Sequence, residues 1–164
     1  MKDQVTLERI QKLHPNLRAE GQAIYDEICN ALKGRAICRF AYTLRTVEEQ
    51  NALYAKGRTV AGKKVTWVKG GYSFHQYGLA ADIVLLKDTN GDGSFETASW
   101  ETNVDFDGDG KADWMEVVAV FQKFGWEWGG SWTKTKDFPH FQKTFSYTCK
   151  QLIKMPKKDG YVIL

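Results

Sequence analysis

Two histidines and two aspartates stand in two short segments of the sequence, and these residue types serve zinc hydrolases as metal ligands and proton carriers. The first segment is 73–82 (SFHQYGLAAD) and the second is 137–140 (DFPH). A catalytic zinc site typically takes three protein ligands and leaves a further position for water. His75, Asp82 and His140 supply such a set, so the sequence predicts a catalytic zinc site.

The surroundings of Asp82 agree with this interpretation. Asp82 opens the apolar run 83–86 (IVLL), which has the pattern of a buried strand. An ionised carboxylate that enters such a core is costly unless a cation compensates its charge. Gly78 lies between the first two candidate ligands, where a residue that tolerates positive φ lets the chain reverse toward one ion. A histidine taken alone is more often structural, and we assign His14, in a Leu-His-Pro break, to that role.

Three motifs in order extend the pattern: SFHQYGLAAD, then WGGSW at 128–132, then DFPH. They resemble the motifs of the zinc peptidases that include D-alanyl-D-alanine carboxypeptidases and L-alanyl-D-glutamate endopeptidases of bacteria and phages. The resemblance runs over about residues 43–141. It implies that the three candidate ligands named above bind zinc, and that the fold is like that of hedgehog and the D,D-peptidases.

Asp137, three residues before the last candidate ligand, is implied by the same resemblance to be the general base. A carboxylate there takes a proton from the attacking water and then delivers it to the leaving amine. Some relatives carry glutamate at this place, so Asp137 is a shorter variant. Glu127, between Trp126 and Trp128, is a rival base that we rank second, because no family motif places it there and it also fits a position facing solvent.

Arg45 is predicted to reach the active site. It stands just before a helix whose start is marked by Thr46 and Glu49, a capping box. In enzymes that the sequence resembles, an arginine of this block (RTVEEQNALYAKGRT, 45–59) reaches the active site, where a guanidinium binds a substrate carboxylate or a developing oxyanion. A surface ion pair is the alternative, and it is the default for Arg58.

Two further residues are candidates for contacting substrate. Ser73 can hydrogen-bond substrate or a metal ligand, although a serine before a turn needs no other function. Trp128 belongs to a group of aromatic side chains that can wall a substrate groove, although aromatic residues beside a sheet are more often core. The other members of this group are Trp126, Trp132 and Phe138. We expect one or two of the four at the cleft.

An acidic, glycine-rich insertion at about 88–116 contains a second metal signature. One segment matches the whole EF-hand loop pattern, in which position 7 offers a backbone carbonyl and position 12 a bidentate glutamate. The residues at positions 1, 3, 5, 7, 9 and 12 are Asp105, Asp107, Asp109, Lys111, Asp113 and Glu116. A segment of helical length, 114–124, follows the loop. We therefore predict a calcium site here.

An earlier segment copies the start of the same pattern. The residues at its positions 1, 3 and 5 are Asp88, Asn90 and Asp92. Position 12 falls on Ser99, so the bidentate glutamate is missing unless Glu96 or Glu101 replaces it. A second calcium site is one interpretation of this segment, and a turn cluster without an ion is the other.

Length and composition favour one peptidase domain over 1–164 that carries the insertion. The chain has 164 residues, of which 43% are hydrophobic and 26% charged, and its net charge of +3 is too small to indicate nucleic-acid binding. No apolar run approaches the ~20 residues of a membrane span, and the first residues lack an apolar signal-peptide core. We expect a monomer, made in the cytoplasm, that does not insert into membranes.

The order of the expected elements predicts an α+β fold: a small, mainly antiparallel sheet carries the zinc site, and helices pack on one side of it. Helices are expected over 6–13, 16–32, the block after residue 45, and 114–124, and strands over 36–44, 80–86 and 139–145.

These motifs favour a zinc peptidase that cuts peptidoglycan stem peptides. The RTxxEQxxLYAxGRT block favours an L-alanyl-D-glutamate endopeptidase, acting as a phage-type endolysin or an autolysin, over a D-alanyl-D-alanine carboxypeptidase or a dipeptidase. A calcium-binding module with a structural zinc site is the non-enzymatic alternative. If the calcium loop is empty at cytosolic calcium and fills outside the membrane, wall cleavage would be delayed until release.

Overall fold

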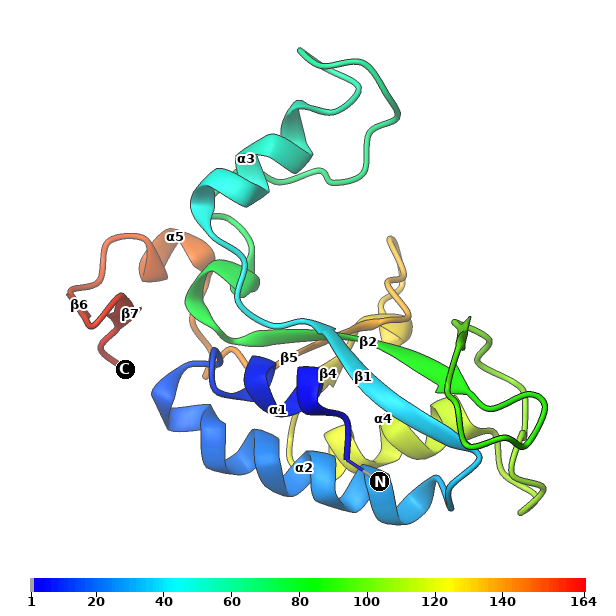
Figure 1. Ribbon diagram of the computed structural model, residues 1–164. Coiled ribbons are helices and arrows are strands. Elements are labelled where there is room, and N and C mark those ends of the chain that lie inside the picture. The colour runs from blue at the N-terminus through cyan, green and yellow to red at the C-terminus, as the bar shows by residue number, and fades with distance from the viewer. Residues whose placement is uncertain (1) are drawn as a thin grey trace.

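The computed structural model describes residues 2–164 and is built around a five-stranded sheet with helices on one face (Figure 1). The strands are β1 (Ala36–Tyr42), β2 (Ala80–Lys87), β3 (Thr97–Ser99), β4 (Glu127–Trp128) and β5 (His140–Gln142). Their order is β1-β2-β5-β4, with β3 also paired to β2, and every pair is antiparallel. The predicted α+β class and mainly antiparallel sheet are confirmed.

The alternation of side chains along β2 explains why this run of apolar residues also carries a carboxylate. Ala81, Ile83 and Leu85 face the hydrophobic core, whereas Asp82 lies on the other face and lines a cleft. Successive side chains of a strand point to opposite faces of the sheet. Asp82 is therefore not buried among the apolar residues that follow it.

β5 follows the same alternation. Phe141 is fully buried in the core, and its neighbours His140 and Gln142 line the cleft on the opposite face. The antiparallel register places His140 directly across from Asp82 on the neighbouring strand. Pairing of these two strands therefore brings two residues that are 58 positions apart in the sequence to one place on the sheet.

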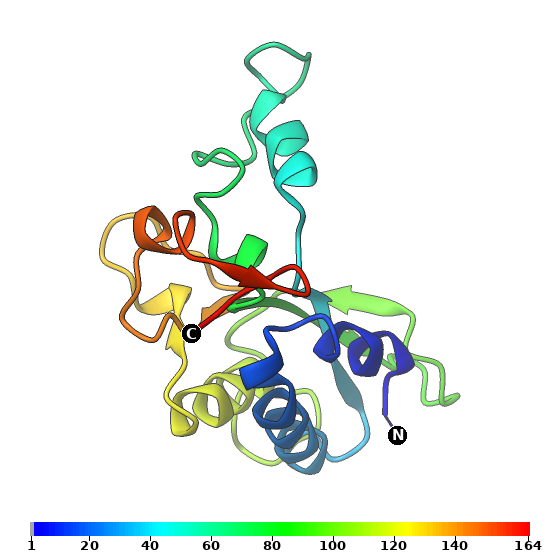
Figure 2. The same ribbon diagram turned by 90° about the vertical axis from the view of Figure 1, so that its left-hand side faces the viewer.

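Helices α1, α2 and α4 cover the core face of the sheet (Figures 1 and 2). Their bounds are α1 (Gln4–Ile10), α2 (Arg18–Ala31) and α4 (Asp113–Lys123), and the 3-10 turn η1 (Pro15–Leu17) precedes α2. Asp3 caps α1 by accepting a hydrogen bond from the Thr6 amide. The ring of Phe121 in α4 stacks on Phe141, with centroids 4.1 Å apart. This stack joins the helical layer to β5.

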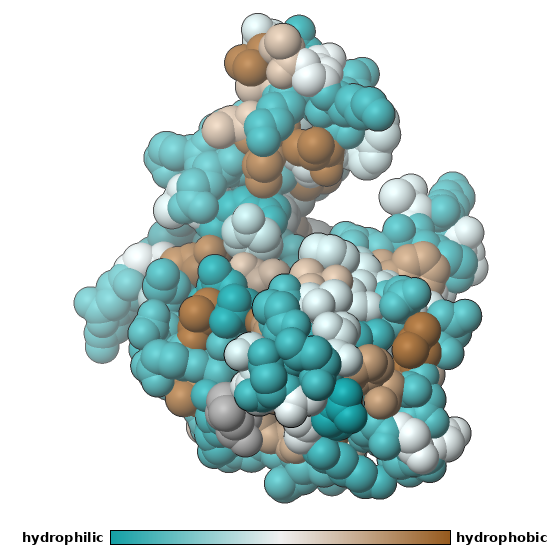
Figure 3. Space-filling view, turned by 45° about the vertical axis from the view of Figure 1, so that its right-hand side comes forward, coloured by the Kyte–Doolittle hydropathy of each residue, from teal (hydrophilic) through white to brown (hydrophobic). Residues whose placement is uncertain are grey.

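Residues 47–72 form an arm that stands away from the sheet on the face opposite the helices (Figures 1 and 2). It begins with α3 (Val47–Ala55), whose predicted capping box between Thr46 and Glu49 is present. Gln50 ties the helix to the returning chain, because its amide nitrogen donates to the Val68 carbonyl at 2.9 Å. Figure 3 shows the arm as a lobe above the rest of the surface, with hydrophobic and hydrophilic residues.

The last part of the chain differs most from the expected elements. The strand predicted over 139–145 ends at Gln142, because Phe145 and Ser146 adopt positive φ and turn the chain. A short helix and a hairpin that the sequence analysis did not predict complete the fold: α5 (Cys149–Leu152), β6 (Lys157–Lys158) and β7 (Tyr161–Val162). Within residues 2–164 no helix has both the length and the apolar character needed to cross a membrane.

Candidate active site

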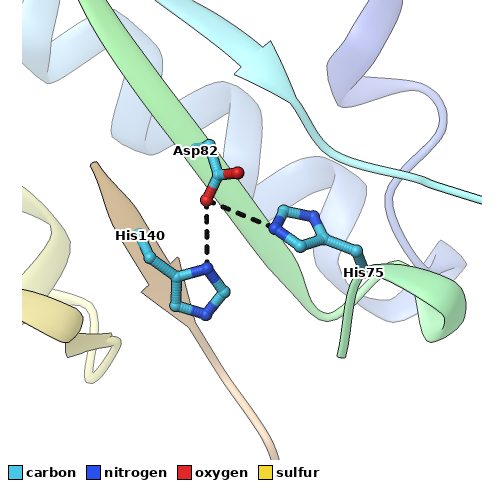
Figure 4. A group of neighbouring side chains, drawn as sticks. All are labelled: His75, Asp82 and His140. Carbon is cyan, nitrogen blue, oxygen red and sulfur yellow. Dashed lines mark hydrogen bonds and ion pairs between the residues drawn. The ribbon is translucent and has the colours of Figure 1, made fainter. Parts of the chain in front are cut away.

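His75, Asp82 and His140 converge on the cleft face of the sheet (Figure 4). His75 comes from the 3-10 turn η2 (Phe74–Tyr77), Asp82 from β2, and His140 from the start of β5. One potential ligand atom of each side chain lies within 4.8 Å of those of the other two. Both histidines are buried, with exposed fractions of 3% and 8%. The structure thus brings together the three residues that the sequence grouped.

The ring of His75 is oriented by the backbone of Thr43. Its Nδ1 atom lies 2.8 Å from the Thr43 carbonyl oxygen, which can only accept a hydrogen bond, so Nδ1 carries the proton. The lone pair of the neutral ring is then on Nε2, which lies 3.2 Å from Asp82 Oδ1. This Nε2 atom is buried and has no hydrogen-bond partner within the described chain. A metal-binding nitrogen held in this way is typical of histidine ligands.

His140 is oriented by two side chains on the same face. Its Nδ1 atom lies 3.0 Å from Asp82 Oδ1 and its Nε2 atom lies 2.8 Å from Gln142 Oε1. The amide nitrogen of Gln142 donates to the Glu127 carboxylate at 2.8 Å, which fixes the amide so that its oxygen faces the imidazole. Nε2 of His140 therefore carries a proton, and in the neutral ring Nδ1 presents its lone pair to the shared centre.

The charges of the three side chains reinforce one another. Burial acts to raise the pKa of Asp82, but the close contacts with His140 and His75 outweigh it and hold that pKa well below its usual range. Burial acts to lower the pKa of His140, and the Asp82 carboxylate outweighs it in the other direction. Two imidazole nitrogens, one of which is the unpartnered Nε2 of His75, and one carboxylate make three donors, which fit a tetrahedral zinc ion with one position left open.

Gly78 and Ser73 shape the turn that carries His75. Gly78 has a φ of 67°, and a side chain there would collide with the backbone of His14, so both conformation and space require glycine. Ser73 caps the turn by accepting a hydrogen bond from the His75 amide at 3.3 Å, and Gln76 completes a capping box. The structure gives Ser73 this structural contact and also places it on the cleft wall.

Asp137 lines the same cleft as the three candidate ligands. Its amide donates to the Gly129 carbonyl at 3.0 Å, and its own carbonyl accepts from the His140 amide at 3.2 Å. A side chain at Gly129 would collide with the Asp137 carbonyl, which explains why the WGGSW segment needs glycine there. Partial desolvation of the carboxyl, opposed by His140 and reinforced by Asp82, raises the pKa of Asp137. The side chain is thus suited to take up a proton.

The cleft has a volume of about 1310 Å³ and lies between the arm and the segment 132–137. Arg45 lies on its wall, with Nη2 3.8 Å from Asp82 Oδ2 and Nη1 donating to Gln50 at 3.1 Å. Arg58 instead donates to the carbonyls of Tyr54 and Thr66, which stabilises the arm. Arg45 is therefore the arginine of its block that is next to the three candidate ligands.

The cleft wall includes one of the four aromatic residues that were expected to supply one or two, but this residue is not Trp128. Trp132 lines the cleft, whereas the ring of Trp128 covers Gly130 and its Nε1 donates to the Phe138 carbonyl at 2.8 Å. Trp67, on the arm, is 69% exposed and also lines the cleft. The sequence analysis missed it because no motif marks Trp67, and its position follows only from how the arm returns to the sheet.

Glu127, the rival base, contacts the residues that surround the candidate ligands and not the ligands themselves. Its two carboxylate oxygens accept hydrogen bonds from the Gln142 amide and from Trp132 Nε1, each at 2.8 Å. Within the described residues it is not part of the cleft wall. Its contacts are those of a residue that orients Gln142.

The acidic insertion forms two loops at the far end of β2, away from the three candidate ligands (Figure 1). Potential ligand atoms come within 4.8 Å of one another in three groups: Asp88, Asp92 and Glu96; Asp105, Asp107 and Asp113; and Asp107, Asp109 and Glu116. Burial and the neighbouring carboxylates of Asp109 and Asp107 raise the pKa of Glu116 to about 6. Lys111, whose backbone carbonyl is the predicted ligand, and Asn90 also stand within the two loops.

Fold and site together define a metallopeptidase. A family model described as D-alanyl-D-alanine carboxypeptidase, of the M15 peptidases, matches residues 67–143. Over 130 residues the chain is 39% identical to the peptidoglycan L-alanyl-D-glutamate endopeptidase CwlK of Bacillus subtilis. This match covers 79% of this chain and 72% of CwlK. The chain therefore belongs to the M15 peptidases, a family of zinc-dependent enzymes.

A solved structure supports the fold independently. The crystal structure of the L-Ala D-Glu endopeptidase ChiX of Serratia marcescens superposes with a TM-score of 0.51 over 87% of this chain and 88% of ChiX. Sequence identity between the two is 24%, so this likeness concerns the fold.

Proposed function

We propose that this chain is a zinc-dependent endopeptidase that hydrolyses the L-alanyl-D-glutamate bond in peptidoglycan stem peptides. The observation that carries the proposal is the 39% identity to CwlK, an endopeptidase named for this bond, over 79% of this chain. The description of the matching family makes D-alanyl-D-alanine carboxypeptidase activity the second candidate.

The proposed zinc ligands are His75 through Nε2, Asp82 through its carboxylate, and His140 through Nδ1. Their support is the orientation of both rings, whose other nitrogens face Thr43 and Gln142, and the buried Nε2 of His75 that lacks a partner in the described chain. When bound, zinc would supply Lewis-acid activation of water and of the scissile carbonyl.

Asp137 is proposed as the general base and acid. It lies in the cleft with the three candidate ligands, and its raised pKa favours proton uptake from the attacking water. The same carboxyl group then returns the proton to the leaving amine. Arg45 is proposed to stabilise negative charge on the substrate or in the transition state, because its guanidinium lies on the cleft wall beside Asp82.

The proposed setting is the cell wall, with peptidoglycan as the only macromolecular partner and a monomeric enzyme. The chain would be made in the cytoplasm and would reach the wall after release, as an endolysin or an autolysin does. A dipeptidase of the cytoplasm is the alternative setting. Activity on intact sacculi favours the first, and activity confined to free dipeptides favours the second.

The decisive experiment is mass spectrometry of the products formed when the zinc-loaded protein digests purified peptidoglycan, with a chelated sample as control. New N-terminal D-glutamate on released peptides supports the proposal. Release of free D-alanine moves the assignment to the carboxypeptidase, and the absence of any zinc-dependent product overturns peptidase activity on the wall.

The role of Asp137 has its own test. Asp137→Ala is expected to abolish hydrolysis while the bound zinc, measured by atomic absorption, stays at one ion per chain. Asp26→Ala, which removes an exposed carboxylate on α2, is the matched control and should retain activity. If Asp137→Ala kept full activity, the assigned mechanism would be wrong.

A further inference from the structure

We propose that the loop 105–116 is a calcium site that closes onto the first turn of α4. This inference goes beyond the peptidase activity and does not depend on it. The site is built from carboxylates at both ends of the loop, since Asp105, Asp107 and Asp109 precede α4 while Asp113 and Glu116 belong to its first turn.

Three carboxylate oxygens in this loop are buried without a hydrogen-bond partner in the described chain. They are Oδ2 of Asp107, Oδ2 of Asp113 and Oε2 of Glu116. Asp113 is only 1% exposed, and its other oxygen accepts a hydrogen bond from the Phe106 amide at 3.2 Å. Leaving buried carboxylate oxygens unsatisfied is costly, so a cation is the expected partner.

The three residues that carry these unpartnered oxygens belong to two overlapping groups of carboxylates. Ligand atoms of Asp105, Asp107 and Asp113 lie within 4.8 Å of one another, and so do those of Asp107, Asp109 and Glu116. Asp107 belongs to both groups, which makes the five carboxylates one continuous cluster. The donors are all hard oxygens from flexible side chains, and this favours calcium over zinc or magnesium.

Positive side chains of the protein compensate little of the negative charge of these five carboxylates. Lys33 donates to Asp109 at 3.0 Å, but the lysine side chain is 58% exposed, and it is the one cation that forms an ion pair with the cluster within residues 2–164. The two ends of the loop are held together without an ion, because the Asp113 amide donates to the Val104 carbonyl at 3.1 Å. The Phe106 ring also lies against Arg35, just before β1, and Lys87, at the end of β2. The cluster therefore has a fixed scaffold and excess negative charge.

The earlier loop provides a contrast. Both oxygens of Asp88 accept hydrogen bonds from backbone amides, at 2.6 Å from Gly91 and 3.0 Å from Gly93. The residue at position 12, Ser99, lies in β3 and donates to Glu101. No buried side-chain oxygen of residues 88–99 is left unpartnered. Asp105 makes the same contacts in the later loop, with Gly108 at 2.7 Å and Gly110 at 2.8 Å, so the two loops differ in their unpartnered buried oxygens and not in this turn. Because the later loop has such oxygens and the earlier loop has none among the described residues, we assign the ion to the later loop alone.

An ion at this site would join the loop to a helix that packs against the core side of β5, the strand that carries His140. The first turn of α4 supplies two of the ligands, and Phe121 near its other end stacks on Phe141, the neighbour of His140. Calcium is therefore expected to stabilise the helical layer beneath β5. Figure 3, in which the loop end of the sheet comes toward the viewer, shows a mostly hydrophilic surface below the arm.

Terbium luminescence tests the site directly on the zinc-loaded protein. Trp114 follows Asp113 in the sequence and is buried, so its excitation should sensitise a terbium ion in the loop. We expect calcium to displace terbium with a stoichiometry of one. Glu116→Gln should weaken calcium binding by about tenfold or more, since the bidentate ligand is lost. Asp88→Asn, the matched control in the earlier loop, should leave binding unchanged.

Thermal unfolding separates loss of binding from loss of folding. Glu116→Gln relieves repulsion among the carboxylates, so without calcium it should unfold at a temperature no lower than wild type does. Calcium should raise the melting temperature of wild type and of Asp88→Asn but not of Glu116→Gln. An equal rise in all three, a response lost only in Asp88→Asn, or no saturable binding would each overturn the proposal, whatever the peptidase assay shows.

Discussion

The imidazole of His140 and the side-chain amide of Gln142 meet on one face of β5, with Nε2 and Oε1 2.8 Å apart. The contact follows from strand geometry, because residues two positions apart point to the same side of a sheet. Glu127, across from Gln142 on β4, holds the amide in the orientation that the histidine needs. Gln142 is thus a positioning residue for a proposed metal ligand.

Replacing Gln142 by leucine should therefore weaken zinc binding. The change removes the acceptor for His140 Nε2 and leaves the ring free to turn, and partners of this kind are worth about 10- to 100-fold in metal affinity. Competition with a chromophoric chelator measures the affinity. Gln122→Leu, at an exposed position of α4, is the control. Equal zinc affinity in the two variants would show that Gln142 has no positioning role.

Trp67 on the arm should contribute to substrate binding. It lines the cleft and is 69% exposed, whereas Trp100 is 58% exposed and lies outside the cleft near the acidic loops. Trp67→Ala should raise KM several-fold with little change in kcat, because a wall residue contacts substrate without touching the reacting atoms. Trp100→Ala should leave both constants unchanged. If both variants had the same KM, Trp67 on the arm would have no role in substrate binding.

Arg45 should affect the chemical step. Arg45→Ala is expected to lower kcat/KM by about 100-fold, the usual effect of losing a donor that stabilises charge in the transition state. Arg45→Lys keeps the charge but loses the planar fork, so it should recover only part of the activity. Thermal unfolding of both variants checks the fold. Wild-type activity in a folded Arg45→Ala protein would contradict this role.

Asp3 gives a prediction about stability and pH. Burial acts to raise its pKa, but hydrogen bonds from Arg39 and Thr6 outweigh it, so the pKa in the folded protein lies below the ordinary value of 3.8. The stabilisation is therefore present above about pH 3.8 and is lost as pH falls through the folded pKa. Asp3→Asn should cost about 2 kcal/mol at neutral pH, because the buried charge that pairs with Arg39 is lost, while the asparagine oxygen can still accept the cap hydrogen bond.

Urea unfolding at pH 7, 5 and 3 measures the effect of Asp3→Asn. The difference in the free energy of unfolding between Asp3→Asn and wild type should be the same at pH 7 and pH 5 and smaller at pH 3. A difference that does not change over this range would show that the charge of Asp3 is not what stabilises the fold. Asp26→Asn, which removes an exposed carboxylate paired with Lys2, should have little effect at any of these values.

The main elements of the sheet and the grouping of the candidate ligands could be predicted because they depend on local pattern. The apolar run after Asp82 marks β2, and the motifs around His75 and His140 identify the segments that meet there. The capping box at Thr46 marks the start of α3. Each of these signals lies within a few residues, so a single sequence suffices to find it.

Features that depend on the return path of the chain could not be predicted in this way. β4 has two residues and is defined by its pairing with β5, so it carries no periodic signal of its own. Trp132 rather than Trp128 lines the cleft because Trp128 packs onto Gly130, a contact between near neighbours that depends on the local turn. Glu127 looks like a solvent-facing acid in sequence and is engaged by two donors in the structure.

The chemistry of Asp82 also favours the correct register of β2 against β5 during folding. Sliding β2 by one residue would turn Asp82 toward the helices and Ile83 toward the cleft, because neighbouring side chains alternate between faces. Such a misfolded chain would have to bury a carboxylate among apolar side chains, at a cost that the correctly paired chain avoids. The proposed zinc ligand Asp82 thus penalises the wrong alignment of the strands, so an inactive, shifted form is disfavoured before any metal binds.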